Sequence, residues 1–381
     1  MVAADVTTGN GKPGPAGRAA RGAALALFCL LLTAALLEAG ARLVLLVMGP
    51  GSAPIQLGWE AGKVRDLVYV PDPELFFRLT PDLDVAETGN PRIFDLQTNA
   101  LGLRGGEIAR TKPPGTYRVL AVGDSCTFGS GAGGAETYPA QLERQLGALR
   151  PDLGFEVLNA GVPGFTSYQA LRYLEIEGFD LQPDAVLFGT GVNDASPARA
   201  GGKRRFGEGR MLSDREYAAA LRAQRGLGIR RLLWRAGLGF GAAGSPVDEG
   251  GDVKRRVPLA EYEKNLASFA EQSRARGILP LIVAWPLESQ ASGWDGRTEV
   301  ELTVERYQRG AAAAAAAQAT PFVDLLPPLL GRADLFIDMV HLSPRGYGVV
   351  AERIARELAG AALPGDRAGA TAGASQAEFP E

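Results

Sequence analysis

A serine on a turn is the first candidate for chemistry in this 381-residue chain. It is Ser125, the last residue of a Gly-Asp-Ser stretch at 123–125 that directly follows the apolar run at 119–122. A turn at the end of a buried strand holds a serine exposed and rigid, which suits a nucleophile. A Gly-Asp-Ser stretch alone more often forms only a turn, so Ser125 needs partners elsewhere in the chain.

The chain contains a single histidine, His341. If the protein uses an imidazole as a general base, that base is therefore His341. One histidine rules out His-cluster metal sites and the paired-histidine zinc motif, and the two cysteines, Cys29 and Cys126, lack zinc-type spacing. We therefore expect that the protein needs neither a metal nor an organic cofactor.

Three more polar segments follow predicted strands. They read Asn-Ala-Gly-Val-Pro-Gly at 159–164, Gly-Val-Asn-Asp at 191–194 and Asp-Met-Val-His-Leu-Ser at 338–343. An activated serine requires a base that takes its proton, a carboxylate that orients the base, and neutral donors that stabilise an oxyanion. Together with the serine turn, these segments offer a candidate for each of the four roles.

The elements that must position these segments alternate between strand and helix. We predict strands at 119–122, 155–158, 184–188, 278–284 and 322–325, and helices at 138–149, 167–177, 259–275 and 300–319, with a last helix opening at Ser343 and Pro344. Near-continuous apolar strands that alternate with helices indicate a parallel sheet covered on both faces. Ligands bind beyond the carboxyl ends of such strands, where the polar segments fall.

In these blocks the sequence resembles the SGNH, or GDSL-type, hydrolase family, over roughly residues 117–358 apart from an insertion. The resemblance implies an α/β fold, a flavodoxin-like three-layer α/β/α sandwich with a parallel sheet. It also implies a role for each matching position: Ser125 as nucleophile and, through its backbone N–H, oxyanion donor; Gly164 and Asn193 as the other oxyanion donors; Asp338 and His341 as the rest of the triad. Cys126 stands where the family often has leucine, which puts no role in doubt.

The function that the resemblance implies is a serine ester hydrolase, an acylhydrolase or acetylesterase, that acts on a small-molecule, glycan or lipid ester. Two alternatives stay open. An O-acyltransferase acting on envelope polysaccharide would use the same triad and differ only in the acceptor of the acyl group. A catalytically inactive binding module is the third option. The substrate and the oligomeric state do not follow from the sequence.

The N-terminal region predicts a membrane anchor. Residues 1–21 form a basic leader that we expect to be flexible, and 22–48 a single transmembrane helix in which Glu38 and Arg42 are spaced to pair. A cleaved signal peptide is the alternative, since Ala-Gly-Ala at 39–41 matches a cleavage pattern, and the protein would then be secreted. A buried soluble helix is a third reading. In both main readings the basic leader places the remaining chain on the extracytoplasmic, periplasmic side.

The rest of the chain divides into a loop-rich lead-in at 49–115, a hydrolase domain at 116–360 with an insertion at 195–258, and a tail at 361–381 that we expect to be disordered. The insertion is strongly basic, with Arg199, Lys203, Arg204, Arg205, Arg210, Arg215, Arg222, Arg225, Arg230, Arg231 and Arg235. These side chains form either a solvated face of a cap, or, with a helix bearing Trp234, a surface for an anionic membrane or substrate. A net charge of −3 predicts no nucleic-acid partner.

Overall fold

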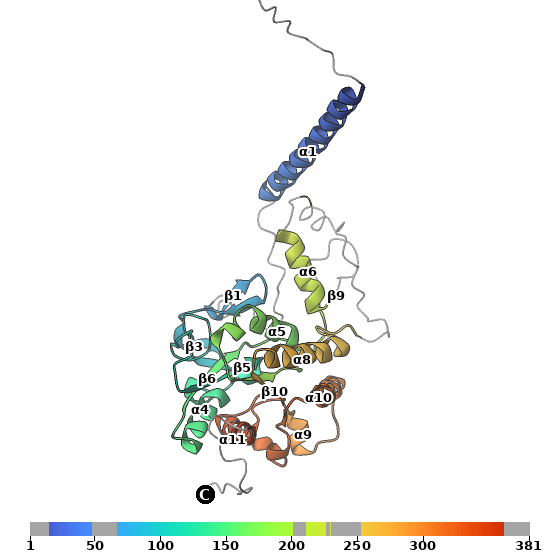
Figure 1. Cartoon of the computed structure of the whole chain (residues 1–381). Helices are drawn as coiled ribbons and strands as arrows, with labels where there is room; N and C mark the ends of the chain where they lie inside the picture. Colours follow the sequence, from blue (N-terminus) through green and yellow to red (C-terminus); the bar gives the residue numbers. More distant parts are fainter. Residues whose placement is uncertain (1–14, 48–66, 201–210, 226–228, 230–252, 362–381) are drawn as a thin grey trace, which may run out of the picture. The chain divides into compact units, whose positions relative to one another are not determined.

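The computed structural model describes residues 15–47, 67–200, 211–225, 229 and 253–361 (Figure 1). The chain forms two compact units, one comprising Met1–Pro54 and Ala219–Ala242, the other Ile55–Ala218 and Ala243–Glu381. The predicted tail beyond residue 361, the Trp234 helix and half of the arginines of the insertion lie outside the described residues.

The second unit is built on a five-stranded parallel sheet with the strand order β11-β10-β7-β5-β6. The strands are β5 (Thr116–Gly123), β6 (Gly154–Gly161), β7 (Ala185–Gly189), β10 (Leu279–Ala284) and β11 (Phe322–Asp324). Counted along the chain, this is the flavodoxin-like order 2-1-3-4-5, in which the chain changes direction between the first and third strands. The predicted parallel α/β fold is therefore confirmed.

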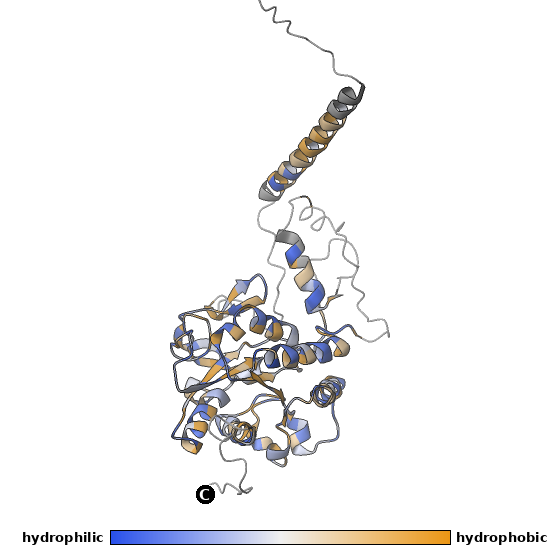
Figure 2. Cartoon of the chain, in the orientation of Figure 1, coloured by the Kyte–Doolittle hydropathy of each residue, from blue (hydrophilic) through white to orange (hydrophobic). Residues whose placement is uncertain are grey.

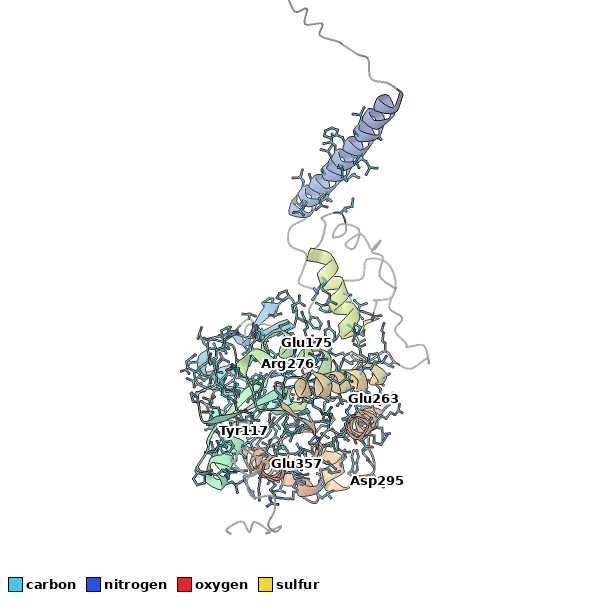
Figure 3. The ribbon with its side chains drawn as sticks, in the orientation of Figure 1. Tyr117, Glu175, Glu263, Arg276, Asp295 and Glu357 are labelled. Carbon is cyan, nitrogen blue, oxygen red and sulfur yellow. The ribbon has the colours of Figure 1, made fainter. Side chains whose placement is uncertain are left out.

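Helices cover both faces of this sheet, as Figure 1 shows. One face carries α5 (Ser167–Ile176), α8 (Leu259–Arg274) and α10 (Glu299–Ala317), and the other carries α4 (Tyr138–Leu149) and α11 (Pro344–Gly360). On the first face Phe269 stacks on Phe188 of β7 with ring centroids 4.6 Å apart. Gln272 of α8 donates to Glu175 of α5, which is labelled in Figure 3, over 3.0 Å. The core thus consists of two layers of side chains, one on each face of the sheet, and the strand β7 between them is fully buried.

Several helix ends follow from local sequence. The Ser343 hydroxyl accepts the Gly346 N–H at the start of α11, with Pro344 in the first turn, as predicted. In the insertion, Ser213 and Glu216 exchange hydrogen bonds at the start of α6 (Asp214–Arg225), and the pair forms a capping box.

Two short antiparallel hairpins precede the sheet. They are β1 (Tyr69–Asp72) with β2 (Phe76–Leu79), and β3 (Asp84–Asn90) with β4 (Ile93–Gln97). The first is tied to α5, because Arg78 donates through both terminal nitrogens to Glu177, over 2.9 and 2.5 Å. Beyond the second hairpin, the buried Arg104 donates to the carbonyls of Phe128, Gly129 and Ala132. These bonds hold the lead-in against the segment that follows β5.

The first unit contains α1 (Pro15–Val47), which is hydrophobic over most of its described length (Figure 2). Its stretch Gly22–Val44 is 23 residues long and apolar enough to cross a membrane, a property that a signal sequence shares. Arg42 Nε lies 2.6 Å from Glu38 Oε1, which confirms the predicted pairing. The pair neutralises the only two charged side chains of that stretch, which lowers the cost of placing them near a membrane.

Candidate active site

Ser125 lies where β5 passes into a short helix. β5 ends at Gly123, and α3 (Ser125–Phe128) begins two residues later. The Asp124 carboxylate caps this helix by accepting the Cys126 N–H over 2.9 Å, and Gly129 ends it with φ 90°. Ser125 is therefore the first helical residue, at the carboxyl end of a central strand.

Two neighbouring strands end at the same level and leave room for this turn. β6 ends at Gly161, which pairs with Gly123. A Cβ on Gly161 would lie 2.1 Å from the backbone nitrogen of Phe128, so only glycine lets α3 approach β6 this closely. Because Gly161 of the Asn-Ala-Gly stretch has no side chain, α3 and the serine turn can pack directly against β6.

The loop between η4 (Ala333–Leu335) and α11 brings His341 to the serine. His341 Nε2 lies 2.8 Å from Ser125 Oγ. His341 Nδ1 lies 2.8 Å from Asp338 Oδ2 and 3.0 Å from Asp338 Oδ1. The structure thus links the predicted residue Ser125 to the predicted pair Asp338 and His341, of which His341 lies 216 positions later in the chain, by consecutive hydrogen bonds.

The surroundings of Asp338 favour its ionised form. Partial burial opposes ionisation, but the His341 ring and the backbone N–H groups of Val340 and His341 lower the pKa of Asp338 below its usual value. Arg92 Nη2 lies 3.0 Å from Asp338 Oδ2 and reaches it from the turn between β3 and β4. Sequence reasoning missed Arg92, because no motif or spacing connects an arginine in the lead-in with residue 338.

Asn193 lies between the serine turn and the loop after β6. Its Nδ2 donates to Phe165 O over 3.0 Å and lies 3.5 Å from Asp124 Oδ2. Phe165 follows Gly164 in the chain, and Asp124 precedes Ser125. These two contacts therefore hold the Asn193 amide near the backbone N–H groups of Gly164 and Ser125, which are the two predicted backbone donors. Gly164 has φ 87°, a left-handed conformation that glycine adopts without strain. Within the described part of the chain, neither the Gly164 N–H nor the Ser125 N–H donates a hydrogen bond.

Buried acidic groups surround these donors. Burial raises the pKa of Asp124 to about 6 and that of Asp194 to about 7. Asp194 accepts hydrogen bonds from the backbone N–H and the hydroxyl of Ser167. Burial also raises the pKa of the Cys126 thiol well above its ordinary value. Because a thiol reacts as its thiolate, Cys126 is a poor nucleophile although it adjoins Ser125.

A hydroxyl, an imidazole and a carboxylate linked in this order can pass the hydroxyl proton to the imidazole while the oxygen attacks an electrophile. The neighbouring amide and backbone N–H groups are neutral donors of the kind that stabilise an oxyanion. Among the residues that the structure describes, no three His, Cys, Asp or Glu side chains are grouped to hold a metal ion. The arrangement is suited to acyl transfer through a serine.

One comparison with known proteins, the match to a family model, agrees with this chemistry. The model of the GDSL-like Lipase/Acylhydrolase family matches residues 121–349. Similar solved structures include a lipase/acylhydrolase from Enterococcus faecalis, 18% identical, with a TM-score of 0.42 over 65% of this chain and 98% of that one. An acetylxylan esterase from Geobacillus stearothermophilus is 21% identical, with a TM-score of 0.42 over 64% and 94%. A putative lipolytic protein of the G-D-S-L family from Desulfitobacterium hafniense DCB-2 is 15% identical, with a TM-score of 0.39 over 63% and 98%. No curated protein matches.

Proposed function

Because the chain belongs to the GDSL-like lipase/acylhydrolase family, we propose that it is a serine ester hydrolase with Ser125, His341 and Asp338 as its catalytic triad. One observation carries the proposal: an unbroken row of hydrogen bonds runs from Ser125 Oγ through the His341 ring to Asp338. In the first step His341 Nε2 removes the Ser125 proton as Oγ attacks the ester carbonyl. Asp338 accepts the Nδ1–H bond, which selects the useful tautomer and stabilises the imidazolium.

The oxyanion that forms in this step is stabilised by three donors. They are the Ser125 N–H, the Gly164 N–H and the Asn193 side-chain amide, each worth about 3 kcal/mol in a well-formed oxyanion hole. Asn193 Nδ2 carries two hydrogens, and one of them already serves Phe165 O. The second faces Asp124 Oδ2 over 3.5 Å, a long hydrogen bond that a substrate oxyanion can replace, while the first keeps the amide in place.

The second half of the reaction reverses the proton transfer. His341 protonates the departing alcohol, and a water molecule then hydrolyses the acyl-enzyme with His341 again as the base. The family implies a small-molecule or polysaccharide ester as substrate. We place the site outside the cytoplasm, with α1 as a single-pass anchor, because Arg18 and Arg21 precede the apolar stretch.

The proposal is tested with Ser125→Ala, and with Cys126→Ala as a control at the adjacent position. Hydrolysis of p-nitrophenyl acetate and labelling by a fluorophosphonate are measured on the full-length chain. We expect Ser125→Ala to abolish labelling and lower kcat by at least about 1,000-fold, and Cys126→Ala to retain both activities. Labelling that depends on Cys126, or activity that survives Ser125→Ala, would overturn the triad. Product formed only with a sugar acceptor present would identify an acyltransferase.

A further inference from the structure

A buried ion pair in the insertion contacts the loop that carries Gly164. Arg256 lies in the last residues before α8 and Asp214 at the start of α6. Arg256 Nη2 and Asp214 Oδ2 are 2.9 Å apart, and the two side chains are 8% and 0% exposed. A charged pair that is removed from water in this way needs further hydrogen bonds to offset its desolvation, so its remaining partners indicate what the pair holds in place.

Three of those partners belong to the segment 164–169. Arg256 donates through Nη1 to Gly164 O over 2.9 Å and through Nη2 to Gln169 Oε1 over 2.9 Å. On the acidic side, the Thr166 hydroxyl donates to Asp214 Oδ2 over 2.8 Å. The planar guanidinium can serve these acceptors at once because its donors are fixed in a fork. The ion pair therefore holds the loop at both its start and its end.

These bonds limit the rotation of the peptide groups around Gly164. The carbonyl of Gly164 is held by Arg256, and the N–H of the same peptide unit, on Phe165, donates to Val162 O over 3.0 Å. With that peptide fixed, the direction of the Gly164 N–H depends only on the two backbone dihedral angles of Gly164, of which φ is 87°. Glycine readily takes other φ and ψ values, so without the arginine on its carbonyl this N–H would sample several directions.

The insertion supplies both halves of the pair from separate segments. The Asp214 N–H donates to Arg256 O over 2.7 Å, and the Arg256 N–H donates to Ser196 O over 2.9 Å. Positions 196, 214 and 256 of the insertion are thus bonded to one another, and two of them, 214 and 256, contact the loop after β6. The segment that interrupts the strand–helix alternation has a structural link to the catalytic centre.

We propose that Arg256 is a positioning residue that, together with Asp214, aims the Gly164 N–H at the oxyanion and so makes the insertion a part of the oxyanion hole. This inference rests on the proposed esterase function. The ion pair then contributes to stabilisation of the transition state and not to substrate binding. The reason is that a misdirected Gly164 N–H weakens binding of the oxyanion and leaves binding of the ester unchanged.

The test compares Arg256→Met with Arg118→Met in the full-length chain. Arg118 is a matched control because it is also fully buried, pairs with Glu156 and donates to the carbonyls of Ala109, Arg110 and Leu181. It lies at the amino-terminal end of β5, next to Tyr117, which Figure 3 labels. We measure kcat and KM for p-nitrophenyl acetate per folded molecule, with the folded fraction taken from circular dichroism.

We expect Arg256→Met to lower kcat about 100-fold with KM changed less than about 3-fold, and Arg118→Met to leave both within about 3-fold. Arg256→Lys keeps the charge but not the fork, so most of the kcat loss should persist. An unchanged kcat in Arg256→Met, an equal loss in Arg118→Met, or a rise in KM alone would overturn the inference.

A second variant covers the case in which Arg256→Met does not fold. Thr166→Val removes only the hydroxyl that donates to Asp214 and leaves the ion pair intact. We expect a kcat about 10-fold lower with KM unchanged, and a kcat equal to that of the wild type would overturn the inference. If the wild type shows no Ser125-dependent hydrolysis, the proposed function is overturned together with the inference. If the wild type is active but the variants keep its kcat, only the inference on Arg256 is overturned.

Discussion

At the scale of single residues, the side-chain amide of Asn193 offers the most direct test of the oxyanion hole. We expect Asn193→Ala to lower kcat by about 100- to 1,000-fold and to change KM little, because the lost donor acts mainly on the transition state. Steady-state kinetics with p-nitrophenyl acetate check this. As a control, Asn99→Ala removes a buried amide that accepts the N–H groups of Leu101 and Leu103. The control should lose stability but keep kcat, and an equal kcat loss in both variants would contradict the assignment.

The buried carboxyl of Asp194 predicts a pH dependence of stability. Burial raises its pKa from 3.8 to about 7 in the folded chain. The folded state therefore binds a proton that the unfolded state has released, and the stability contributed by this proton is full below about pH 4 and lost as the pH rises through 7. Relative to Asp194→Asn, the wild type should lose up to about 1.4 kcal/mol of unfolding free energy per pH unit in that range. Urea unfolding at pH 4.5, 6 and 7.5 measures this, and parallel curves for the two proteins would contradict it.

Residues of the candidate site differ in how well the sequence predicts them. Ser125 is predicted by the Gly-Asp-Ser motif, and His341 is predicted because it is the single histidine of the chain. Neither prediction requires knowledge of contacts between distant parts of the chain. Arg92 and Arg256 act through contacts with Asp338 and Gly164, which are 246 and 92 positions away along the chain. Such contacts depend on how loops are folded over the sheet, and a single sequence contains no periodic pattern that reports them.

At the scale of secondary-structure elements, the close packing of α3 on β6 predicts a strong effect of one methyl group. In Gly161→Ala the new Cβ would lie 2.1 Å from Phe128 N and 2.6 Å from the carbonyl carbon of Thr127. Since these are backbone atoms of the helix that begins at Ser125, we expect α3 to shift, the free energy of unfolding to fall by about 1–3 kcal/mol and hydrolysis to be lost. Urea unfolding and p-nitrophenyl acetate kinetics measure the two effects.

The matched control is Gly147→Ala in the last turn of α4. A Cβ at this position would meet no atom within 4 Å. Alanine is the better helix former, so the free energy of unfolding should stay constant or rise by up to about 1 kcal/mol. Gly161→Ala with the stability and activity of this control would contradict the packing argument.

The elements themselves were largely predictable, because each strand of the sheet is a short apolar run and each long helix has an apolar face. The helix predicted at 138–149 is observed as Tyr138–Leu149. The five-residue α9 (Glu288–Ser292) and the pairing of the lead-in hairpins were not predicted. A helix of one turn has no detectable period, and the lead-in strands of four to seven residues depend for their stability on packing against α5 and the serine turn.

At the scale of the whole molecule, the apolar stretch of α1 predicts attachment to a membrane. Leu31 and Leu32 lie in its middle with 59% and 47% of their surface exposed in the structure. Replacing both by arginine adds about 6 kcal/mol to the cost of insertion, whereas replacing both by isoleucine adds almost nothing. We expect the wild type and the isoleucine variant to remain in the membrane pellet after carbonate extraction, and the arginine variant to leave it.

The same preparation separates an anchor from a signal peptide. An anchored chain retains α1, so mass spectrometry of the membrane fraction should find its N-terminus before residue 22. Cleavage after the Ala-Gly-Ala stretch would instead give a soluble product that begins at residue 42. That product would contradict the anchor and leave the proposed esterase function untouched.

The bonds between the lead-in and α5 also set an order of events during synthesis. Arg78 and Glu177 are 99 residues apart, and Leu75 O accepts a hydrogen bond from Gln169, 94 residues later. At about 5–20 residues per second, the first hairpin leaves the ribosome roughly 5–20 seconds before its partners do. During that interval Phe76 and Phe77 lack Tyr168 and Phe165, two of the aromatic rings that they contact in the folded chain. We therefore expect the lead-in to need protection by a chaperone until these partners emerge.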